Sequence, residues 1–476
     1  MAGFVPMASG HGVIDSPLYW PVVRLRDAYR RGELSPVEVL EEALARIDRF
    51  NPELHAFLGR LDDLAREQAL AAERAWRDGS AGPLCGIPVS IKDTFHIEGH
   101  VATYGSRAYE NNRVATDSGV VRRLRAAGAV FTGRTNTSEF AQSATTENRF
   151  FDDCHNPWDV TRTTGGSSGG AAASVAAGLS TLAVGADGGG SIRIPASFTG
   201  VFGIKPSYGL CRDENGLSAM SDFIAPGPFA WRVADARAML AVLADTPYRY
   251  RTPEAGLRIG WCARPSNCPH ESQVVDVTGA AVRKIAAMGH DVTEVDLDLE
   301  GWQEAFGPLV LQNEFRERGH LLRSSAELLT GYERKTLELA QNLTPYQVDA
   351  ARRAHGLYAE RIQQLFRQFD FVVLPTTAVT AFPVKQRPQV IDGQPVHWLW
   401  GAFPGTSAFN VAGNPAASLP CGFADSLPVG LQVVGPRMGE ENLLSFCEDL
   451  EGALAIDCTA VQQKWALPAD HRQVLS

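Results

Sequence analysis

Residues 163–195 read TTGGSSGGAAASVAAGLSTLAVGADGGGSIRIP, and the prediction of the fold starts from this stretch. Between Gly165 and Ser191 lie 27 residues, of which nine are Gly, seven are Ala and five are Ser. The pattern predicts a small-residue helix over 170–178 and a strand over 180–184, with a glycine-rich turn on either side (165–170 and 185–191). A helix that leads directly into a strand is typical of α/β proteins.

The same helix-to-strand step recurs along the chain. Helical patterns over 117–127, 274–288 and 362–366 precede strand patterns over 129–132, 292–295 and 371–374. This alternation predicts the α/β class, as a three-layer α/β/α arrangement in which a large mixed central sheet is flanked by helices. Residues 301–370 are nearly all helical in pattern, and we expect them to form a helical cap.

Two local signals place elements near the N-terminus. Ser35-Pro36-Val37-Glu38 is a capping box with proline at the first helical position, and it predicts a helix that runs to about residues 51–52. Apolar residues at 87, 89 and 91 alternate with other types, which predicts a strand with Lys92 near its carboxyl end.

Composition limits the classes of partner. Lys and Arg total 44 against 54 for Asp and Glu, which gives a net charge of −10, and no basic run stands out. This charge disfavours nucleic acid as a partner. The longest weakly polar stretch, 171–186, is too short for a membrane span. Eight cysteines without a C-x-x-C pair indicate reduced thiols and a cytoplasmic location.

The glycine-rich stretch has the residue types that acyl transfer requires. A serine hydroxyl is a weak nucleophile until a base removes its proton, and the oxyanion that it generates needs preorganised N–H donors. The successive N–H groups of Gly188, Gly189, Gly190 and Ser191 form an oxyanion hole in outline. Lys92 can act as the base if desolvation lowers its pKa. Asp187 and Arg193 bracket this turn and are expected to support it.

These stretches together resemble the amidase signature family. The resemblance rests on GIPVSIKD (86–93), Thr135-Asn136 with Glu139-Phe140-Ala141, residues 163–195, GIKP (203–206) and LPVGLQ (427–432). It implies a single α/β/α domain over residues 1–476 and a hydrolase of C–N bonds without metal or cofactor. It also implies a triad in which Ser191 is the nucleophile, Ser167 bridges after a cis peptide bond, and Lys92 is the base.

The substrate pocket is less well marked. Asn136 and Ser138 follow a strand at a position where the family lines its pocket, and Arg212 and Phe223 belong to a segment, 208–228, that we expect to act as a mobile lid. Aromatic residues gather around 223–231 and 397–403. An apolar, aryl-bearing amide or carbamate is therefore the expected substrate, bound by a monomer or homodimer.

Several activities stay open at this point. Amide, carbamate (urethanase) and ester hydrolysis use the same apparatus. Some family members hydrolyse glutamine as one subunit of an amidotransferase, within a tRNA-dependent complex. Arg134 and the run 221–228 depart from the pattern of those subunits. A third alternative is an α/β-hydrolase-type esterase, because residues 165–169 satisfy G-x-S-x-G, but that fold also needs a downstream acid and histidine.

Overall fold

A computed structural model describes residues 16–468 of the chain. Its centre is a sheet of 11 strands in the order β1-β3-β2-β4-β6-β5-β12-β13-β9-β7-β8. The strands are β1 (Phe57–Arg60), β2 (Pro88–Lys92), β3 (Val130–Thr135), β4 (Leu182–Asp187), β5 (Phe202–Lys205), β6 (Ala225–Ala230), β7 (Arg258–Trp261), β8 (Asp291–Glu294), β9 (Phe371–Pro375), β12 (Ala416–Ala424) and β13 (Leu427–Val434). A separate hairpin pairs β10 (Val390–Ile391) with β11 (Gln394–Pro395).

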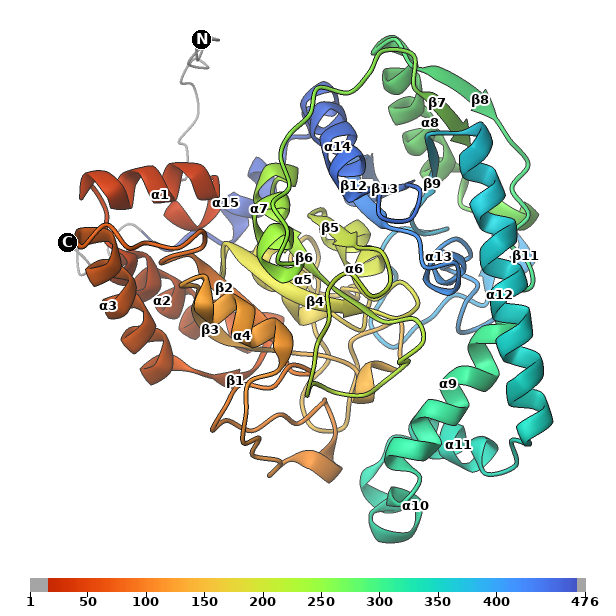
Figure 1. Cartoon of the computed structure of the whole chain (residues 1–476), viewed down its shortest axis with the longest axis horizontal. Coiled ribbons are helices and arrows are strands. Elements are labelled where there is room, and N and C mark those ends of the chain that lie inside the picture. Colours follow the sequence, from red (N-terminus) through yellow and green to blue (C-terminus); the bar gives the residue numbers. More distant parts are fainter. Residues whose placement is uncertain (1–15, 469–476) are drawn as a thin grey trace.

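Helices flank the sheet, and groups of helices lie at the two ends of the molecule (Figure 1). They are α1 (Val22–Arg31), α2 (Pro36–Leu54), α3 (Asp62–Arg77), α4 (Gly119–Ala126), α5 (Gly169–Ala176), α6 (Arg193–Thr199), α7 (Val233–Leu243), α8 (Ser272–Ala287), α9 (Trp302–Arg318), α10 (Leu321–Ser324), α11 (Gly331–Ala340), α12 (Pro345–Gln368), α13 (Ser407–Val411), α14 (Glu440–Leu454) and α15 (Thr459–Lys464). Helices α1–α3 gather at one end of the molecule and α9–α12 at the other (Figure 1).

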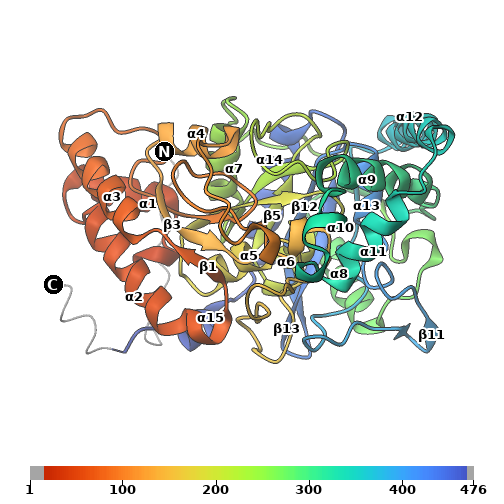
Figure 2. The same cartoon turned by 90° about the horizontal axis from the view of Figure 1, so that it is seen from below.

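The sheet is mixed, as the sequence predicts. Strands β3, β2 and β4 pair in parallel, as do β9, β7 and β8, while the pairs between β4 and β9 are antiparallel. The strands pass through the middle of the molecule with helices around them (Figure 2). The α/β/α class is therefore confirmed.

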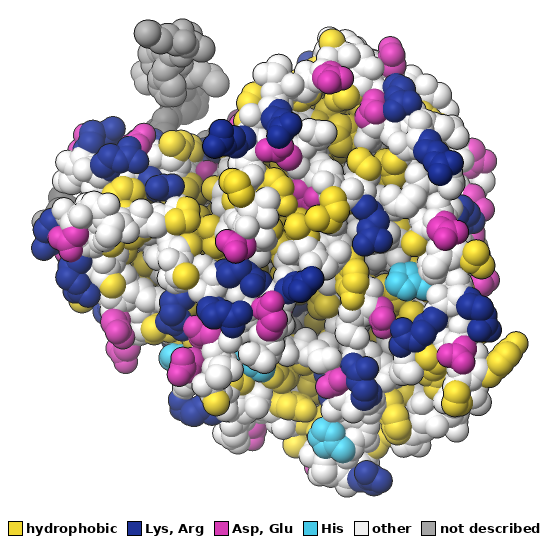
Figure 3. All heavy atoms as spheres, viewed as in Figure 1, with side chains coloured by type: hydrophobic (Ala, Val, Ile, Leu, Met, Phe, Trp, Pro, Cys, Tyr) yellow, Lys and Arg dark blue, Asp and Glu magenta, His cyan; other side chains and the backbone are white. Residues whose placement is uncertain are grey.

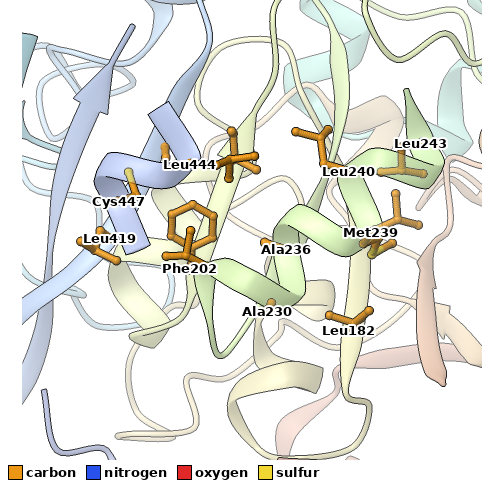
Figure 4. Close-up of a cluster of buried hydrophobic side chains, with 14 of the residues drawn as sticks. Leu182, Phe202, Ala230, Ala236, Met239, Leu240, Leu243, Leu419, Leu444 and Cys447 are labelled. Carbon is orange, nitrogen blue, oxygen red and sulfur yellow. The ribbon is translucent and has the colours of Figure 1, made fainter. Parts of the chain in front are cut away.

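A continuous apolar core fills the space between the central strands and the helices α7 and α14. Figure 4 shows Phe202 of β5 between Leu419 of β12 and the side chains of α7 and α14. Phe202, Met239 and Leu444 have no exposed surface. Burial of this apolar area contributes most of the favourable free energy that holds the layers together.

Local predictions near the N-terminus and in the glycine-rich stretch are largely confirmed. Helix α2 begins with the expected capping box, in which Ser35 Oγ accepts from Val37 N at 3.1 Å and Glu38 accepts from Ser35 N at 2.7 Å. Strand β4 begins at Leu182, later than the expected 180, and ends at Asp187, later than the expected 184, because residues 185–187 still pair with β6.

The lid expected over 208–228 is instead attached to α4. The Asp213 carboxylate accepts from Val120 N at 3.0 Å, and the Glu214 carbonyl accepts from Gly119 N at 2.8 Å. Arg212 also accepts, through its carbonyl, from the Arg123 side chain. Because these bonds fix the tip of the segment to a helix, the structure gives no support to a mobile lid.

The distribution of surface charge and the character of the helices bear on the expected partners of the protein. On the face shown in Figure 3, Lys and Arg side chains are interspersed with Asp and Glu rather than gathered in one patch. Over the residues that the structure describes, no helix has the length and apolar character needed to cross a bilayer.

The core makes a direct prediction for stability. Phe202→Ala should lower the free energy of unfolding by roughly 3–5 kcal/mol, because the buried ring leaves a cavity that its neighbours fill only in part. Leu357→Ala, at a position of α12 that is 69% exposed, should change it by less than about 0.5 kcal/mol. Denaturant unfolding of both variants measures the difference, and equal losses would contradict this description of the core.

Candidate active site

Three elements of the chain bring the predicted triad to one edge of the sheet. Lys92 ends β2, Ser167 lies one residue before the N-cap Ser168 of α5, and Ser191 lies in the turn between β4 and α6. Strands β2 and β4 are parallel neighbours, so their carboxyl ends meet at the same edge. The two glycine-rich turns therefore face the last residue of β2.

Lys92 is fully buried and bonded to serine hydroxyls. Its Nζ donates to Ser167 Oγ at 2.7 Å, to Ser168 Oγ at 2.9 Å and to the Ala186 carbonyl at 3.4 Å. Burial lowers the pKa of Lys92 to about 7, although the nearby Asp187 carboxylate raises it. A large fraction of this amine is therefore neutral near pH 7 and able to accept a proton.

The turn that carries Ser167 packs so closely against Thr145 that Gly166 has no space for a side chain. The Gly166–Ser167 peptide bond is cis. A Cβ at Gly166 would lie 2.4 Å from the Thr145 carbonyl carbon, so only glycine fits there. Ser168 is held as well, since its Oγ donates to the Ala186 carbonyl at 3.2 Å.

Ser191 is 7% exposed and lines a cavity of about 320 Å³. Its carbonyl accepts from Ser168 N at 3.2 Å, which ties the two turns together. Within residues 16–468, no hydrogen bond joins Ser191 Oγ to Ser167 Oγ. Catalytic hydrogen bonds of unliganded enzymes are often long and tighten only in the complex with substrate.

Asp187 and Arg193 form a fully buried ion pair beneath the Ser191 turn. Arg193 Nε and Nη2 each lie 2.9 Å from a carboxylate oxygen of Asp187. Burial alone would raise the pKa of Asp187, but Arg193, Lys205 and Asn410 outweigh it and hold this pKa well below its usual range. Asp187 is therefore ionised at every working pH.

The same arginine connects the turn to distant parts of the chain. Arg193 Nη1 donates to the Thr406 carbonyl at 2.9 Å and to Gln432 Oε1 at 2.6 Å. The Gly189 carbonyl accepts from Thr406 Oγ1 at 2.8 Å and from Ser407 Oγ at 3.0 Å. These contacts fix the backbone of the turn from its buried side.

One of the four expected oxyanion donors is already engaged. Gly190 N donates to Asp187 Oδ1 at 2.7 Å. The prediction that Gly190 N is a donor of the oxyanion hole is therefore wrong. Among the described residues, no hydrogen bond engages the N–H groups of Gly188, Gly189 and Ser191. These three groups are the available donors for an oxyanion.

The cavity that contains Ser191 has mostly apolar and aromatic walls. Helix α9 contributes Phe306 and Val310, helix α11 contributes Tyr332, and the segment after β11 contributes Trp398 and Trp400. The rings of Phe306 and Trp400 meet edge to face with centroids 5.8 Å apart. Of the two aromatic neighbourhoods noted in the sequence, the one at 397–403 lines this cavity.

None of the four residues expected to line the substrate pocket lines the cavity that contains Ser191. Asn136 is buried and donates to the carbonyls of His55 and Asp152, both at 2.9 Å, so its amide is a structural tie. Ser138 and Arg212 line two other cavities. Phe223 is 1% exposed and stacks behind Phe306 with centroids 5.1 Å apart.

Sequence reasoning missed the contribution of α9 and α11 to the wall. Their helical pattern marks apolar faces but gives no indication of which face meets the sheet edge.

The α/β-hydrolase alternative requires a histidine beside the nucleophile. None of the described histidines lines the cavity that contains Ser191. Among the described residues, no group of three or more His, Cys, Asp and Glu side chains could hold a metal ion.

Comparison with known proteins identifies the family. The Amidase family model matches residues 38–444, so the chain belongs to the amidase signature family and is an enzyme that hydrolyses C–N bonds of amides. The A subunit of the Glutamyl-tRNA(Gln) amidotransferase from Methylobacillus flagellatus is 34% identical, over 89% of this chain and 94% of that protein.

Solved structures agree with this assignment. The structure of a bacterial aryl acylamidase of the amidase signature family superimposes with a TM-score of 0.86 at 26% identity, over 94% of this chain and 99% of that chain. The structure of 6-aminohexanoate cyclic dimer hydrolase complexed with substrate gives a TM-score of 0.83 at 28% identity, over 93% and 98%.

The environment of Lys92 predicts the pH dependence of the reaction. If Lys92 is the base, kcat/KM should rise with pH through one ionisation near pH 7, because only the unprotonated amine accepts a proton. Lys92→Ala should remove this ionisation together with most of kcat. Lys92→Arg should not restore it, since a guanidinium stays protonated. An unchanged pH profile in Lys92→Ala would show that another group is the base.

The buried ion pair predicts a large effect on stability. Arg193→Met should lower the free energy of unfolding by roughly 3–5 kcal/mol, because it leaves the buried charge of Asp187 without its partner. Arg258→Met makes the same change in a pair with Asp370 whose arginine side chain is 50% exposed, and should cost less than about 1 kcal/mol. Similar losses in chemical unfolding of the two variants would contradict the role given to Arg193.

Proposed function

We propose that this chain is a free-standing amidase that hydrolyses apolar, aryl-bearing amides through an acyl-enzyme on Ser191. The observation that carries the proposal is the buried Lys92, whose Nζ lies 2.7 Å from Ser167 Oγ. The next residue, Ser168, is bonded through its N–H to the carbonyl of Ser191, which lines the cavity. A desolvated lysine in contact with a serine is a group that can accept a proton near neutral pH.

The first half of the reaction forms the acyl-enzyme. Ser191 Oγ attacks the carbonyl carbon while its proton passes to Ser167 Oγ, and the proton of Ser167 passes to the neutral amine of Lys92. The N–H groups of Gly188, Gly189 and Ser191 are the donors available to stabilise the oxyanion. The proton then returns from Lys92 through Ser167 to the amide nitrogen, the C–N bond breaks and the amine leaves.

The second half releases the acid. Water attacks the acyl carbonyl as its proton follows the same path to Lys92, and the ester bond to Ser191 breaks with return of that proton to Ser191 Oγ. An amine is a poor leaving group unless it is protonated. The relay therefore matters more for amides than for activated esters.

The walls of the cavity support the proposed substrate class. Aromatic rings from α9, α11 and the 398–400 segment favour an apolar body with an aryl group over a small polar amide. A carbamate presents a similar carbonyl to the same groups, so we include aryl carbamates among the expected substrates. The likeness to the solved structure of a bacterial aryl acylamidase also supports this class.

An amidotransferase role is the second candidate. It is favoured by the 34% identity to the amidotransferase protein from Methylobacillus flagellatus. The chain would then hydrolyse glutamine within a complex. The apolar cavity wall argues against this candidate, because glutamine offers little apolar surface to it.

The triad predicts a ranked set of variants. Ser191→Ala should reduce turnover to trace levels while the melting temperature changes little, since only one hydroxyl is lost. Ser167→Ala should be nearly as damaging. Ser168→Ala is the matched control and should retain more kcat than Ser167→Ala, because its hydroxyl lies outside the proposed path. Turnover of an anilide by purified variants measures the ranking, and a fully active Ser191→Ala would refute the assignment.

A substrate panel separates the two candidate functions. Pure protein without partners should hydrolyse anilides and aryl carbamates with higher kcat/KM than short aliphatic amides or glutamine. Esters of the same acyl groups serve as the control for an intact nucleophile. Activity on glutamine alone would favour the amidotransferase and reject the substrate class proposed here.

A further inference from the structure

A second cavity adjoins the one that contains Ser191. Its volume is about 380 Å³, and it shares Ser143, Tyr332 and Trp398 with the catalytic cavity. The two cavities differ in chemistry. The catalytic cavity is mostly apolar, whereas the second one is lined by three cations and three carboxylates. A substrate that filled both would need an apolar part and a polar end.

Two of the three cations in this second cavity already have partners. Arg149 Nη1 donates to the carbonyls of Glu327 and Leu329 at 2.8 and 2.7 Å. Lys385 Nζ lies 3.3 Å from the Asp153 carboxylate. Neither Arg149 nor Lys385 has a buried side-chain nitrogen that lacks a hydrogen-bond partner, which distinguishes both from the third cation.

Arg387 is that third cation, and part of its guanidinium has no partner. Its Nη2 donates to the hydroxyls of Ser143 and Thr145, next to the catalytic turn. Its Nη1 is buried without a hydrogen-bond partner, and no carboxylate among the described residues forms an ion pair with it. The Cζ atom lies 5.6 Å from the centre of the Trp398 ring. Arg387 as a whole is only partly buried, but a buried guanidinium nitrogen is rarely left without an acceptor.

We propose that Arg387 is a specificity-determining residue that binds a carboxylate of the substrate, at the end remote from the scissile amide. The proposal rests on the proposed amidase function and narrows its substrate class to apolar amides with one acidic end. A guanidinium presents parallel N–H groups that match a carboxylate. Ser143, which Arg387 contacts, belongs to both cavities, so a ligand on Arg387 can extend toward Ser191.

The neighbouring charges favour a single negative charge on the ligand. Glu139 is occupied, since it accepts from Ser106 Oγ at 2.6 Å and from Thr330 N at 2.8 Å. Glu147 lines the same cavity, and its field acts on Arg387 although the two form no ion pair. A dianion such as a phosphate monoester would meet more repulsion here than a carboxylate. Glu147 therefore opposes the ligand, and its removal should strengthen binding.

Matched substrates test the proposal directly. One arm compares monoanilides of straight-chain dicarboxylic acids with neutral anilides of the same acyl length. The other arm compares N-acyl aminobenzoates with the corresponding neutral anilides. In at least one arm the carboxylate should raise kcat/KM by about tenfold or more, as expected for a charge-assisted hydrogen bond. The arm that responds identifies which half of the substrate reaches Arg387.

Variants separate binding from a merely structural role. Arg387→Met should raise KM for the acidic substrate at least about tenfold more than for its neutral partner, and Glu147→Gln should lower KM for the acidic substrate. Arg334→Met is the matched control on the outer side of α11, where its side chain is 52% exposed, and should leave the ratio between the two substrates at its wild-type value. An equal change for acidic and neutral substrates in Arg387→Met would overturn the proposal.

Failure of the amidase function can be told apart from failure of this subsite. Calorimetric binding of benzoate and of the dicarboxylic monoanilides to Ser191→Ala reports on Arg387 even if no anilide is hydrolysed. Binding that is lost in the double variant Ser191→Ala with Arg387→Met supports the subsite. Turnover of neutral anilides with no preference for acidic ones, and no carboxylate binding to Ser191→Ala, would refute the subsite and leave the amidase function intact.

Discussion

The buried pair of Asp187 and Arg193 is the interaction on which the active edge of the sheet depends. Two oppositely charged side chains can be buried together only when they form an ion pair and their remaining donors and acceptors form hydrogen bonds. Here the remaining donors of Arg193 reach Thr406, Asn410 and Gln432, more than 200 positions away along the chain. The turn that carries Ser191 is thus held by segments that meet only after the whole sheet has formed.

The same carboxylate also acts on the reactivity of the site. Burial lowers the pKa values of Lys92 and Lys205 to about 7, and Asp187 raises both. Without that negative charge, desolvation would act on Lys92 unopposed, and the amine would be a weaker base. The group that fixes the nucleophile turn therefore also adjusts the proton acceptor, so backbone geometry and basicity at this edge have a common origin.

Short-range signals in the sequence predicted much of the fold and the core of the site. The capping box at Ser35 and the strand that ends at Lys92 depend on neighbouring residues, so they can be recognised locally. The substrate pocket could not, because its wall requires α9, α11 and the 398–400 segment to meet in space. Asn136 shows why local sequence cannot identify pocket residues. A polar residue after a strand resembles a pocket residue until its hydrogen bonds to the carbonyls of His55 and Asp152 are known. The engaged N–H of Gly190 likewise depends on the path of the turn.

The aromatic wall has a consequence for protein engineering. Phe306 and Tyr332 belong to helices at the far end of the molecule from α1–α3 (Figure 1) and take no part in the hydrogen bonds around Lys92 and Arg193. Substitutions at Tyr332 would therefore change which substrates fit without removing a hydrogen bond of the proton relay. Phe306 differs, because its ring also lies against Gly189 in the turn that carries Ser191. Substrate selectivity can thus be varied on the α11 side of the cavity while the residues of the reaction centre stay unchanged.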